Sequence, residues 1–226
     1  MWSKHSSASL TFLLLAAVGL TACEADSYDK GDGKWSHTIA DFAELWADGQ
    51  KRGVSFVTDD GASFVFDQAV KASWIKTGDS TYRTSIYYNP IAEGVAHPVA
   101  CSQTPTVRAK EPSEFSRQPQ DPLSVESCWM SKNGKYLNLA LLLKNGRNSE
   151  GSETTHVISL VHDGTRQNSD QTQTACYRLL HDKRDAPEYY TNRHYVSILL
   201  PSNNRPDSVE LTIKTYQGNW IRKMKI

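Results

Sequence analysis

Excess charge of either sign is missing from this sequence. Its 226 residues include 25 lysines and arginines and 25 aspartates and glutamates, for a formal net charge of zero. Nucleic-acid binding rests on neutralising phosphates, and docking on anionic lipid rests on basic residues. Neutrality therefore argues against a nucleic-acid partner and against a membrane held by charge alone.

Cysteines are few, and metal-binding motifs are lacking. After Cys23, the spacing of Cys101, Cys128 and Cys176 forms neither a CxxC pair nor a zinc-ligand set. In an oxidising compartment one pair of these three could form a disulfide, and the sequence does not choose which. We expect small, buried thiols in strands and no metal or other cofactor.

Long stretches with the apolar periodicity of a helix are also absent, whereas strand patterns recur almost throughout. In residues 35–110, apolar residues alternate on both sides of Asp59-Asp60-Gly61, a strong hairpin signal. Further strands are expected at 38–46, 81–88 and 94–108, with a short helix or loop at 68–78. Five strands with such an insertion predict a small OB-type Greek-key barrel domain.

A second strand-rich region follows a proline-rich linker at residues 111–122, which is expected to be extended and semi-rigid. In residues 123–226, Asn133-Gly134 suits a type I′ hairpin turn. Leu137, Leu139, Leu141 and Leu143 share one face at the strand period of two. About seven such strands predict an antiparallel, immunoglobulin-like β-sandwich domain, so the chain as a whole is all-β.

The start of the chain does contain an apolar run, at residues 10–20, too short to span a bilayer as a stable helix. Lys4 and His5 precede it, and Leu20-Thr21-Ala22-Cys23 closes it. This segment resembles a bacterial lipoprotein signal peptide (1–22) with its lipobox. The resemblance implies lipidation of Cys23, cleavage before it, and stable anchoring by two or three acyl chains. Loss of Lys4 leaves 24 basic against 25 acidic residues.

Residues 23–34 are acidic, contain glycine and have little apolar surface, so we expect a flexible tether. Acidic residues after the lipid-bearing cysteine resemble surface-export signals of Bacteroidetes lipoproteins, although a plain solvated linker fits equally well. The expected location is the cell envelope, lipid-anchored at the outer membrane, on either its periplasmic or its surface face.

The order of lipobox, tether, barrel and sandwich resembles the NigD-like lipoproteins of Bacteroidetes. The likeness is carried by strand and turn patterns such as Tyr136-Leu137-Asn138-Leu139, Tyr177-Arg178-Leu179-Leu180-His181 and Asp207-Ser208-Val209-Glu210-Leu211. It implies an N-terminal OB domain and a C-terminal β-sandwich. It brings no catalytic residues, and the bacteriocin locus behind the family's name suggests self-protection.

Polar residues that could carry chemistry cluster in the second half. They are His156, His162, His181 and His194, with Asp163, Asp182 and Asp185 nearby. Their spacing matches no metal-ligand motif, and no GxSxG elbow supplies a nucleophile. We interpret the histidines as hydrogen-bonded surface or strand-end residues, and Asp59-Asp60-Gly61 as a turn and not a calcium loop.

Aromatic residues suggest a binding role instead. Six of them crowd the first domain: Trp35, Trp46, Trp74, Tyr82, Tyr87 and Tyr88. They either line an exposed barrel face or fill the barrel and its junction with the sandwich. Residues 185–192 form a second aromatic segment, a loop or single helical turn.

Three functions remain open. We favour a non-enzymatic envelope lipoprotein that binds a protein, peptide or glycan. The alternatives are self-protection against a bacteriocin or antimicrobial peptide, and a glycan or peptide hydrolase with a dispersed site. The sequence determines neither the oligomeric state nor the ligand-binding residues.

Overall fold

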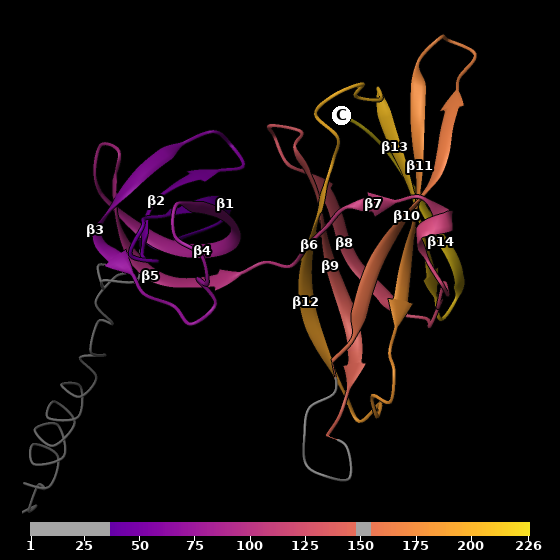
Figure 1. Ribbon diagram of the computed structural model, residues 1–226, viewed down its shortest axis with the longest axis horizontal. Helices are drawn as coiled ribbons and strands as arrows, with labels where there is room; N and C mark the ends of the chain where they lie inside the picture. Colours follow the sequence, from indigo (N-terminus) through magenta and orange to yellow (C-terminus); the bar gives the residue numbers. More distant parts are fainter. Residues whose placement is uncertain (1–36, 148–154) are drawn as a thin grey trace, which may run out of the picture. The chain divides into compact units, whose positions relative to one another are not determined.

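The computed structural model describes residues 37–147 and 155–226. Within them the chain forms fourteen strands and one 3-10 helix (Figure 1). No helix in this part of the chain is long and apolar enough to cross a membrane. The expected signal peptide and tether, together with Cys23 and Trp35, lie outside the described residues.

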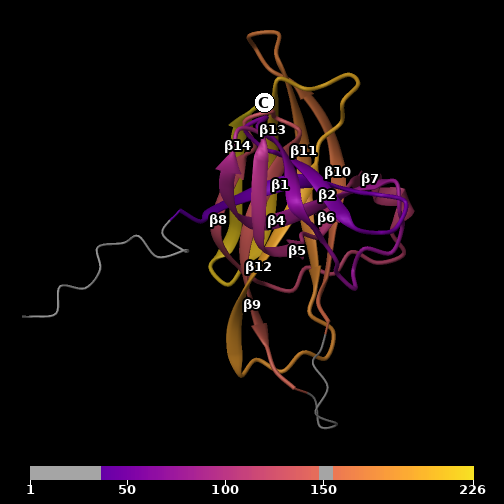
Figure 2. The same cartoon turned by 90° about the vertical axis from the view of Figure 1, so that its left-hand side faces the viewer.

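The first group of strands is a closed barrel. It comprises β1 (Ile39–Ala47), β2 (Gly53–Thr58), β3 (Ser63–Val70), β4 (Ser80–Ala92) and β5 (Val95–Gln103). The order around the barrel is β1-β2-β3-β5-β4, and Figure 2 shows β4 between β1 and β5. Strands β3 and β5 run parallel, and the other neighbours are antiparallel. This is the connectivity of an OB-type Greek-key barrel, as predicted.

Alternate residues of the barrel strands fill its interior. Ala43, Leu45 and Ala47 of β1 are fully buried. They surround Phe56 of β2, whose ring stacks on Phe64 with the centroids 5.1 Å apart. Burying each such large side chain contributes about 1.5–3 kcal/mol, so these few rings supply much of the stability of a small barrel.

The insertion expected at residues 68–78 is a loop. Strand β3 continues to Val70, and the chain then crosses to β4 without a helix. Trp74 packs on Tyr82, whose hydroxyl accepts the Thr77 N–H at 2.7 Å and donates to the Thr77 carbonyl at 2.9 Å. These side-chain contacts hold the loop in place of helical hydrogen bonds.

The second group of strands forms two packed sheets. It comprises β6 (Thr106–Val107), β7 (Ala109–Lys110), β8 (Ser124–Met130), β9 (Tyr136–Asn145), β10 (Val157–Gln167), β11 (Gln173–Asp182), β12 (Tyr190–Leu199), β13 (Ser208–Thr215) and β14 (Gly218–Lys225). One sheet has the order β14-β13-β11-β10-β7 and the other β6-β12-β9-β8. The predicted β-sandwich is therefore confirmed. Its pairing is not antiparallel throughout, because β13, β7 and β6 run parallel to β11, β10 and β12.

The core of the sandwich lies between the two sheets. The leucines at 137, 139, 141 and 143 of β9 are at most 3% exposed, as their alternation predicts. Opposite them lie Leu160, Leu179 and Leu211 of the other sheet, in the same apolar cluster. Asn138 of β9 lies on the opposite face, where it contacts Arg83 and Asp59 of the barrel.

Two hairpin turns have the same geometry, and one of them differs from its prediction. Gly134 has φ +65° and donates to the Ser131 carbonyl, and Gly61 has φ +88° and donates to the Thr58 carbonyl. A type I′ turn would also need a positive φ at Asn133, which has none. Both turns are type I followed by a left-handed glycine. The Asn133 side chain accounts for the difference, because its Oδ1 accepts the Lys135 N–H and the Ser131 hydroxyl.

The passage from barrel to sandwich occurs earlier in the chain than expected. Residues 106–110, assigned to the barrel from sequence, already pair with β12 and β10. Residues 111–122 contain the 3-10 helix η1 (Pro112–Glu114), and Gln120 bridges to His181. We therefore place the division between the domains at Thr104–Pro105. The proline-rich segment lies along the sandwich because backbone bonds hold it there.

Candidate functional site

Arg83 of β4 is the centre of a buried polar cluster where the barrel meets the sandwich. Its Nη1 and Nη2 donate to the two carboxylate oxygens of Asp59 at 2.5 and 2.7 Å. Its Nε donates to Ser197 Oγ and its Nη2 to Asn138 Oδ1, both at 3.0 Å. The guanidinium lies 4.0 Å from the centroid of the Tyr136 ring. This bidentate pair with further partners satisfies a charge that is only 6% exposed.

A second polar contact and an aromatic cluster complete this junction. Glu44 accepts hydrogen bonds from the Tyr136 hydroxyl at 2.6 Å and from Lys135 Nζ at 2.5 Å. Burial acts to raise the pKa of Glu44, but these two donors outweigh it and the pKa is lowered. The aromatic cluster consists of Phe42, Trp129 and Tyr195. The groups of the junction are thus paired with one another and serve the interface.

The barrel aromatics predicted as a binding face are divided among several places. Tyr88 is 3% exposed in the barrel core, and Trp74 and Tyr82 pack on each other. Trp46 and Tyr87 are exposed, at 42% and 46%. Most of the described rings therefore support the barrel, and two remain on its surface.

The predicted aromatic segment at 185–192 joins β11 to β12 without a helix. Tyr189 is 80% exposed there. Its neighbour Glu188 pairs with Lys144 and Lys183 at 3.0 and 2.7 Å. These donors lower the pKa of Glu188 to about 2. The segment is a surface loop held by ion pairs.

Three of the four predicted histidines come together at one end of the sandwich. His156 Nδ1 lies 2.8 Å from His181 Nε2, and the two rings stack with centroids 5.0 Å apart. Asn145 bridges His156, at 3.0 Å, to His194, at 3.5 Å. His162 is not part of this group. Burial lowers the pKa of all three clustered histidines, so they are neutral near pH 7.

The acids expected near these histidines have other roles. Asp182 pairs with Arg117, and Asp163 pairs with Arg178 at 2.8 Å. Asp185 lies exposed on the surface loop. Within residues 37–147 and 155–226, no three or more histidine, cysteine or acidic side chains are placed to hold a metal ion.

The three described cysteines are free and half-buried. Burial raises the pKa of Cys101 to about 11 and that of Cys128 to about 12. The thiol of Cys128 lies 3.7 Å from the sulfur of Met224. Thiols with raised pKa values are poor nucleophiles at neutral pH, and here they pack as small apolar groups.

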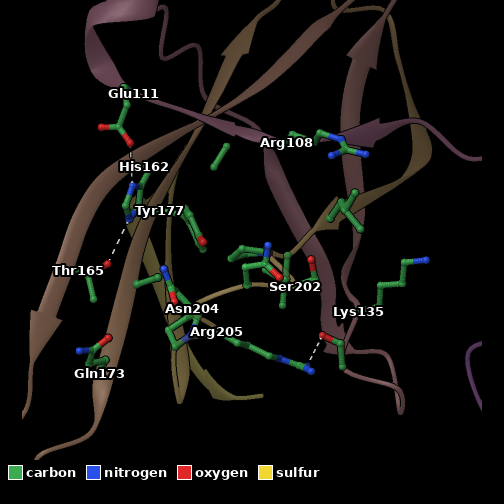
Figure 3. A pocket seen from close by; sticks show the side chains of 18 of the residues that line it. Arg108, Glu111, Lys135, His162, Thr165, Gln173, Tyr177, Ser202, Asn204 and Arg205 are labelled. Atoms are coloured by element: carbon green, nitrogen blue, oxygen red, sulfur yellow. Dashed lines mark hydrogen bonds and ion pairs between the residues drawn. The ribbon is translucent and has the colours of Figure 1, made fainter.

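A cavity of about 840 Å³ (Figure 3) opens at one end of the sandwich. The residue 185–192 loop lies at the other end. The cavity walls come from the segment of β7 and η1, the β8–β9 turn, β10, β11 and the connection from β12 to β13. This volume is within the range of small-molecule sites. None of the residues singled out from sequence as chemical candidates lies in it, except His162.

Tyr177 of β11 forms a buried part of the cavity wall. It is 4% exposed, and its ring packs on His162 with the centroids 5.5 Å apart. Figure 3 shows its hydroxyl directed toward the interior of the cavity. The hydroxyl has no hydrogen-bond partner among the described residues, and burial raises its pKa. Buried hydroxyls are normally paired, so this one is available to a bound group.

An acid, an imidazole and a hydroxyl stand in a row on one wall of the cavity (Figure 3). Glu111 Oε1 lies 3.0 Å from His162 Nδ1, and Thr165 Oγ1 lies 3.4 Å from His162 Nε2. The order resembles that of a nucleophile, base and orienting acid. However, Glu111 is 63% exposed and the hydroxyl contact is long. The row can bind polar groups, and its geometry falls short of an activated nucleophile.

Comparison with known proteins assigns the family. The model of the NigD-like C-terminal beta sandwich domain matches residues 106–225, more than half of the chain. The chain belongs to the NigD-like family. The match includes every element that lines the cavity. No curated protein matches the chain.

Solved structures show the same fold at low sequence identity. A NigD-like immunity protein from Bacteroides caccae aligns at 20% identity with a TM-score of 0.59, over 82% of this chain and 91% of its own. A toxin-related protein from Parabacteroides distasonis aligns at 17% identity with a TM-score of 0.62, over 84% of this chain and 93% of its own. A Bacteroides fragilis protein provisionally described as a lipoprotein aligns at 11% identity with a TM-score of 0.56, over 84% of this chain and 97% of its own. These likenesses establish the two-part NigD-like fold.

Sequence reasoning missed most of the cavity in this NigD-like chain. Its lining includes Arg108 and Arg205, which stand far apart in the sequence and in no motif. The one local signal was the polar connection Pro201-Ser202-Asn203-Asn204-Arg205-Pro206, too long and too polar for a tight turn.

Proposed function

We propose that this NigD-like protein is a lipid-anchored protein of the bacterial cell envelope that binds a ligand or partner without transforming it. The cavity in the sandwich carries the proposal, because it presents a buried, unpaired Tyr177 hydroxyl and charged groups at a size suited to a ligand. The row of Glu111, His162 and Thr165 adds polar contacts and lacks the geometry of a catalytic site.

The envelope location rests on the lipobox that ends at Cys23. Likeness to a provisionally described lipoprotein supports it. Replacing Cys23 with Ala should abolish labelling by radioactive palmitate and leave unprocessed precursor. Unchanged labelling of the variant would show that Cys23 is not the anchor, and separation of inner and outer membranes would test the expected outer-membrane location.

Binding is tested with the full chain in its own envelope. Crosslinking followed by recovery of the protein should return a specific partner, or a glycan or peptide array should return a specific ligand. Substitution of Tyr177 by Phe should weaken that binding. Failure of both searches to give any specific binder would contradict the proposal.

Self-protection is a second candidate, favoured by the fold shared with an immunity protein. It predicts that a strain without this protein becomes more sensitive to a bacteriocin or antimicrobial peptide. Equal sensitivity of the deletion and parent strains would remove this candidate.

Hydrolysis is a third candidate, favoured only by the row of Glu111, His162 and Thr165. It predicts turnover of a glycan or peptide ester that is lost in both His162→Ala and Thr165→Ala. Turnover retained in Thr165→Ala would exclude that hydroxyl as the nucleophile.

A further inference from the structure

Two positively charged side chains in the cavity lining have no carboxylate partner among the described residues. Lys135 lies in the lining, but its Nζ pairs with Glu44 of the barrel at 2.5 Å. The acid of the lining, Glu111, lies 3.0 Å from His162 Nδ1. Arg108 and Arg205 remain, and neither pairs with a described carboxylate.

Most arginines elsewhere in the described residues do have a carboxylate partner. Of the eleven arginines in the described residues, six pair with a carboxylate. Two of the remaining five line the cavity. Arg205 is positioned by a hydrogen bond from Nη2 to the Gly134 carbonyl at 2.6 Å (Figure 3). A guanidinium fixed by a neutral acceptor keeps its charge available, and its planar fork suits an oxyanion.

Several other lining residues are polar and uncharged, beside apolar ones such as Ala109 and Leu199. The side chains of four lining residues have no hydrogen-bond partner within residues 37–147 and 155–226: Gln173, Ser202, Asn203 and Asn204. Amides and hydroxyls can donate and accept at the same time, which matches neighbouring hydroxyls of a sugar. Of the apolar lining residues, Leu200 and Pro206 are buried, Leu199 is half-buried and Pro201 is exposed.

We infer that the cavity binds an anionic saccharide, with Arg108 and Arg205 each available to an acidic group of it and the Tyr177 hydroxyl on a ring oxygen or hydroxyl. This inference rests on the proposed binding function and names its ligand class. Charge selects an anion, and the amide-rich lining selects a polyhydroxylated one. An acidic peptide shares the charge but would leave the amides and Tyr177 with fewer partners.

The test uses the full chain, purified in detergent, and a panel of saccharides. The acidic probes are oligomers of galacturonic, glucuronic and mannuronic acid, together with sulfated oligosaccharides. Methyl-esterified or desulfated counterparts supply matched neutral probes. We expect at least one acidic probe to bind about tenfold or more tightly than its neutral counterpart, and the affinity to fall with added salt.

Variants assign the binding to this cavity. Arg108→Gln and Arg205→Gln should each weaken it about tenfold, because each removes a charge-assisted hydrogen bond. Tyr177→Phe should weaken it several-fold. Arg222→Gln is the matched control, since Arg222 is exposed, lacks a described carboxylate partner and lies on β14 outside the lining. Melting curves check that each variant is folded.

The possible outcomes distinguish failure of the anionic saccharide from failure of the proposed binding function. Equal binding of acidic and neutral probes, or affinity unchanged in both cavity arginine variants, overturns the anionic saccharide. Binding of a poly-glutamate peptide with no binding of any saccharide also overturns it, while the proposed binding function stands. No binding of any probe overturns this inference, and an accompanying failure of envelope crosslinking overturns the proposed function as well. Comparison of the sulfated and uronic-acid probes shows whether the bound anionic group is a sulfate or a carboxylate.

Discussion

Arginine and tyrosine side chains occur both at the junction of barrel and sandwich and in the cavity at the sandwich end. Those at the junction have hydrogen-bond partners, whereas some of those in the cavity have none. At the junction, Arg83 makes hydrogen bonds to three side chains and Glu44 accepts two. In the cavity, Arg108 has no described partner and Tyr177 has a buried hydroxyl without one. Arginines and tyrosines that are paired hold the fold together, whereas unpaired ones at a concave surface indicate binding.

The two regions share one structural element. The β8–β9 turn reaches the barrel through Asn133 N–H, which donates to the Asp59 carbonyl at 3.1 Å. The same turn reaches the cavity through the Gly134 carbonyl, which accepts from Arg205. Adjacent residues of one turn, Asn133 and Gly134, therefore contact the two regions.

The largest effect is expected from Arg83→Ala. The substitution removes the charged partner of the partly buried Asp59 carboxylate, which keeps the Asn138 Nδ2 donor. It also removes one donor each from Ser197 Oγ and Asn138 Oδ1, which stay hydrogen-bonded to each other. The loss should be about 3–5 kcal/mol in the free energy of unfolding, measured by guanidinium titration. Arg205→Ala is the control, with a change of about 0.5 kcal/mol or less. Similar losses in the two variants would erase the distinction between the regions.

A smaller effect is expected from Gly134→Ala in the shared turn. An alanine at φ +65° costs about 1–2 kcal/mol. Its Cβ would also collide with Arg205 Nη2, so that side chain must move. Ligand affinity should fall together with stability.

Gly61→Ala supplies the matched control for this turn. Gly61 has φ +88° in a turn of the same type, and a Cβ there meets nothing within 4 Å. Stability should fall by a comparable amount while affinity is unchanged. Equal losses of affinity in the two variants would show that strain alone, and not displacement of Arg205, affects the cavity.

Much of the fold could be predicted from sequence because it follows local patterns. Alternation in β9 placed four leucines in the core, and Asp60-Gly61 placed a hairpin. The short strands β6 and β7 were missed, since two residues cannot show a period. Their pairing depends on β12 and β10, which lie about fifty to ninety residues further along the chain.

The candidate site could hardly be predicted at all. Arg108, Tyr177 and Arg205 come from three elements and meet only through the sandwich topology. The histidines were grouped by sequence distance, and the structure separates His162 from the other three. Sequence proximity identified residue types that cluster, but pairing and burial decide which of them are free to bind.

The histidine cluster should give a pH-dependent effect on stability. Burial lowers the pKa values of His156, His181 and His194 in the folded state, whereas unfolded histidines titrate near 6.5. The unfolded chain therefore binds more protons just below that pH. Stability should be complete above pH 7, fall as the pH drops through about 6.5, and level off once the folded histidines protonate.

Melting curves between pH 8 and 5 measure this dependence. His156→Gln should reduce the slope, because it removes one of the clustered groups. A parent protein whose melting temperature is constant across this range would contradict neutral burial of the three imidazoles.

The smallest effect on stability, and the sharpest separation of the two regions, is expected from Tyr177→Phe. Its hydroxyl is buried without a described partner, so removing it breaks no hydrogen bond and spares the cost of burying a polar group. The free energy of unfolding should stay within about 0.5 kcal/mol or rise slightly. Tyr136→Phe is the counterpart at the junction, where the hydroxyl donates to Glu44, and should cost about 1.5–3 kcal/mol. If Tyr177→Phe were the more destabilising change, its hydroxyl would have a structural partner, and the case for a ligand at that position would fail.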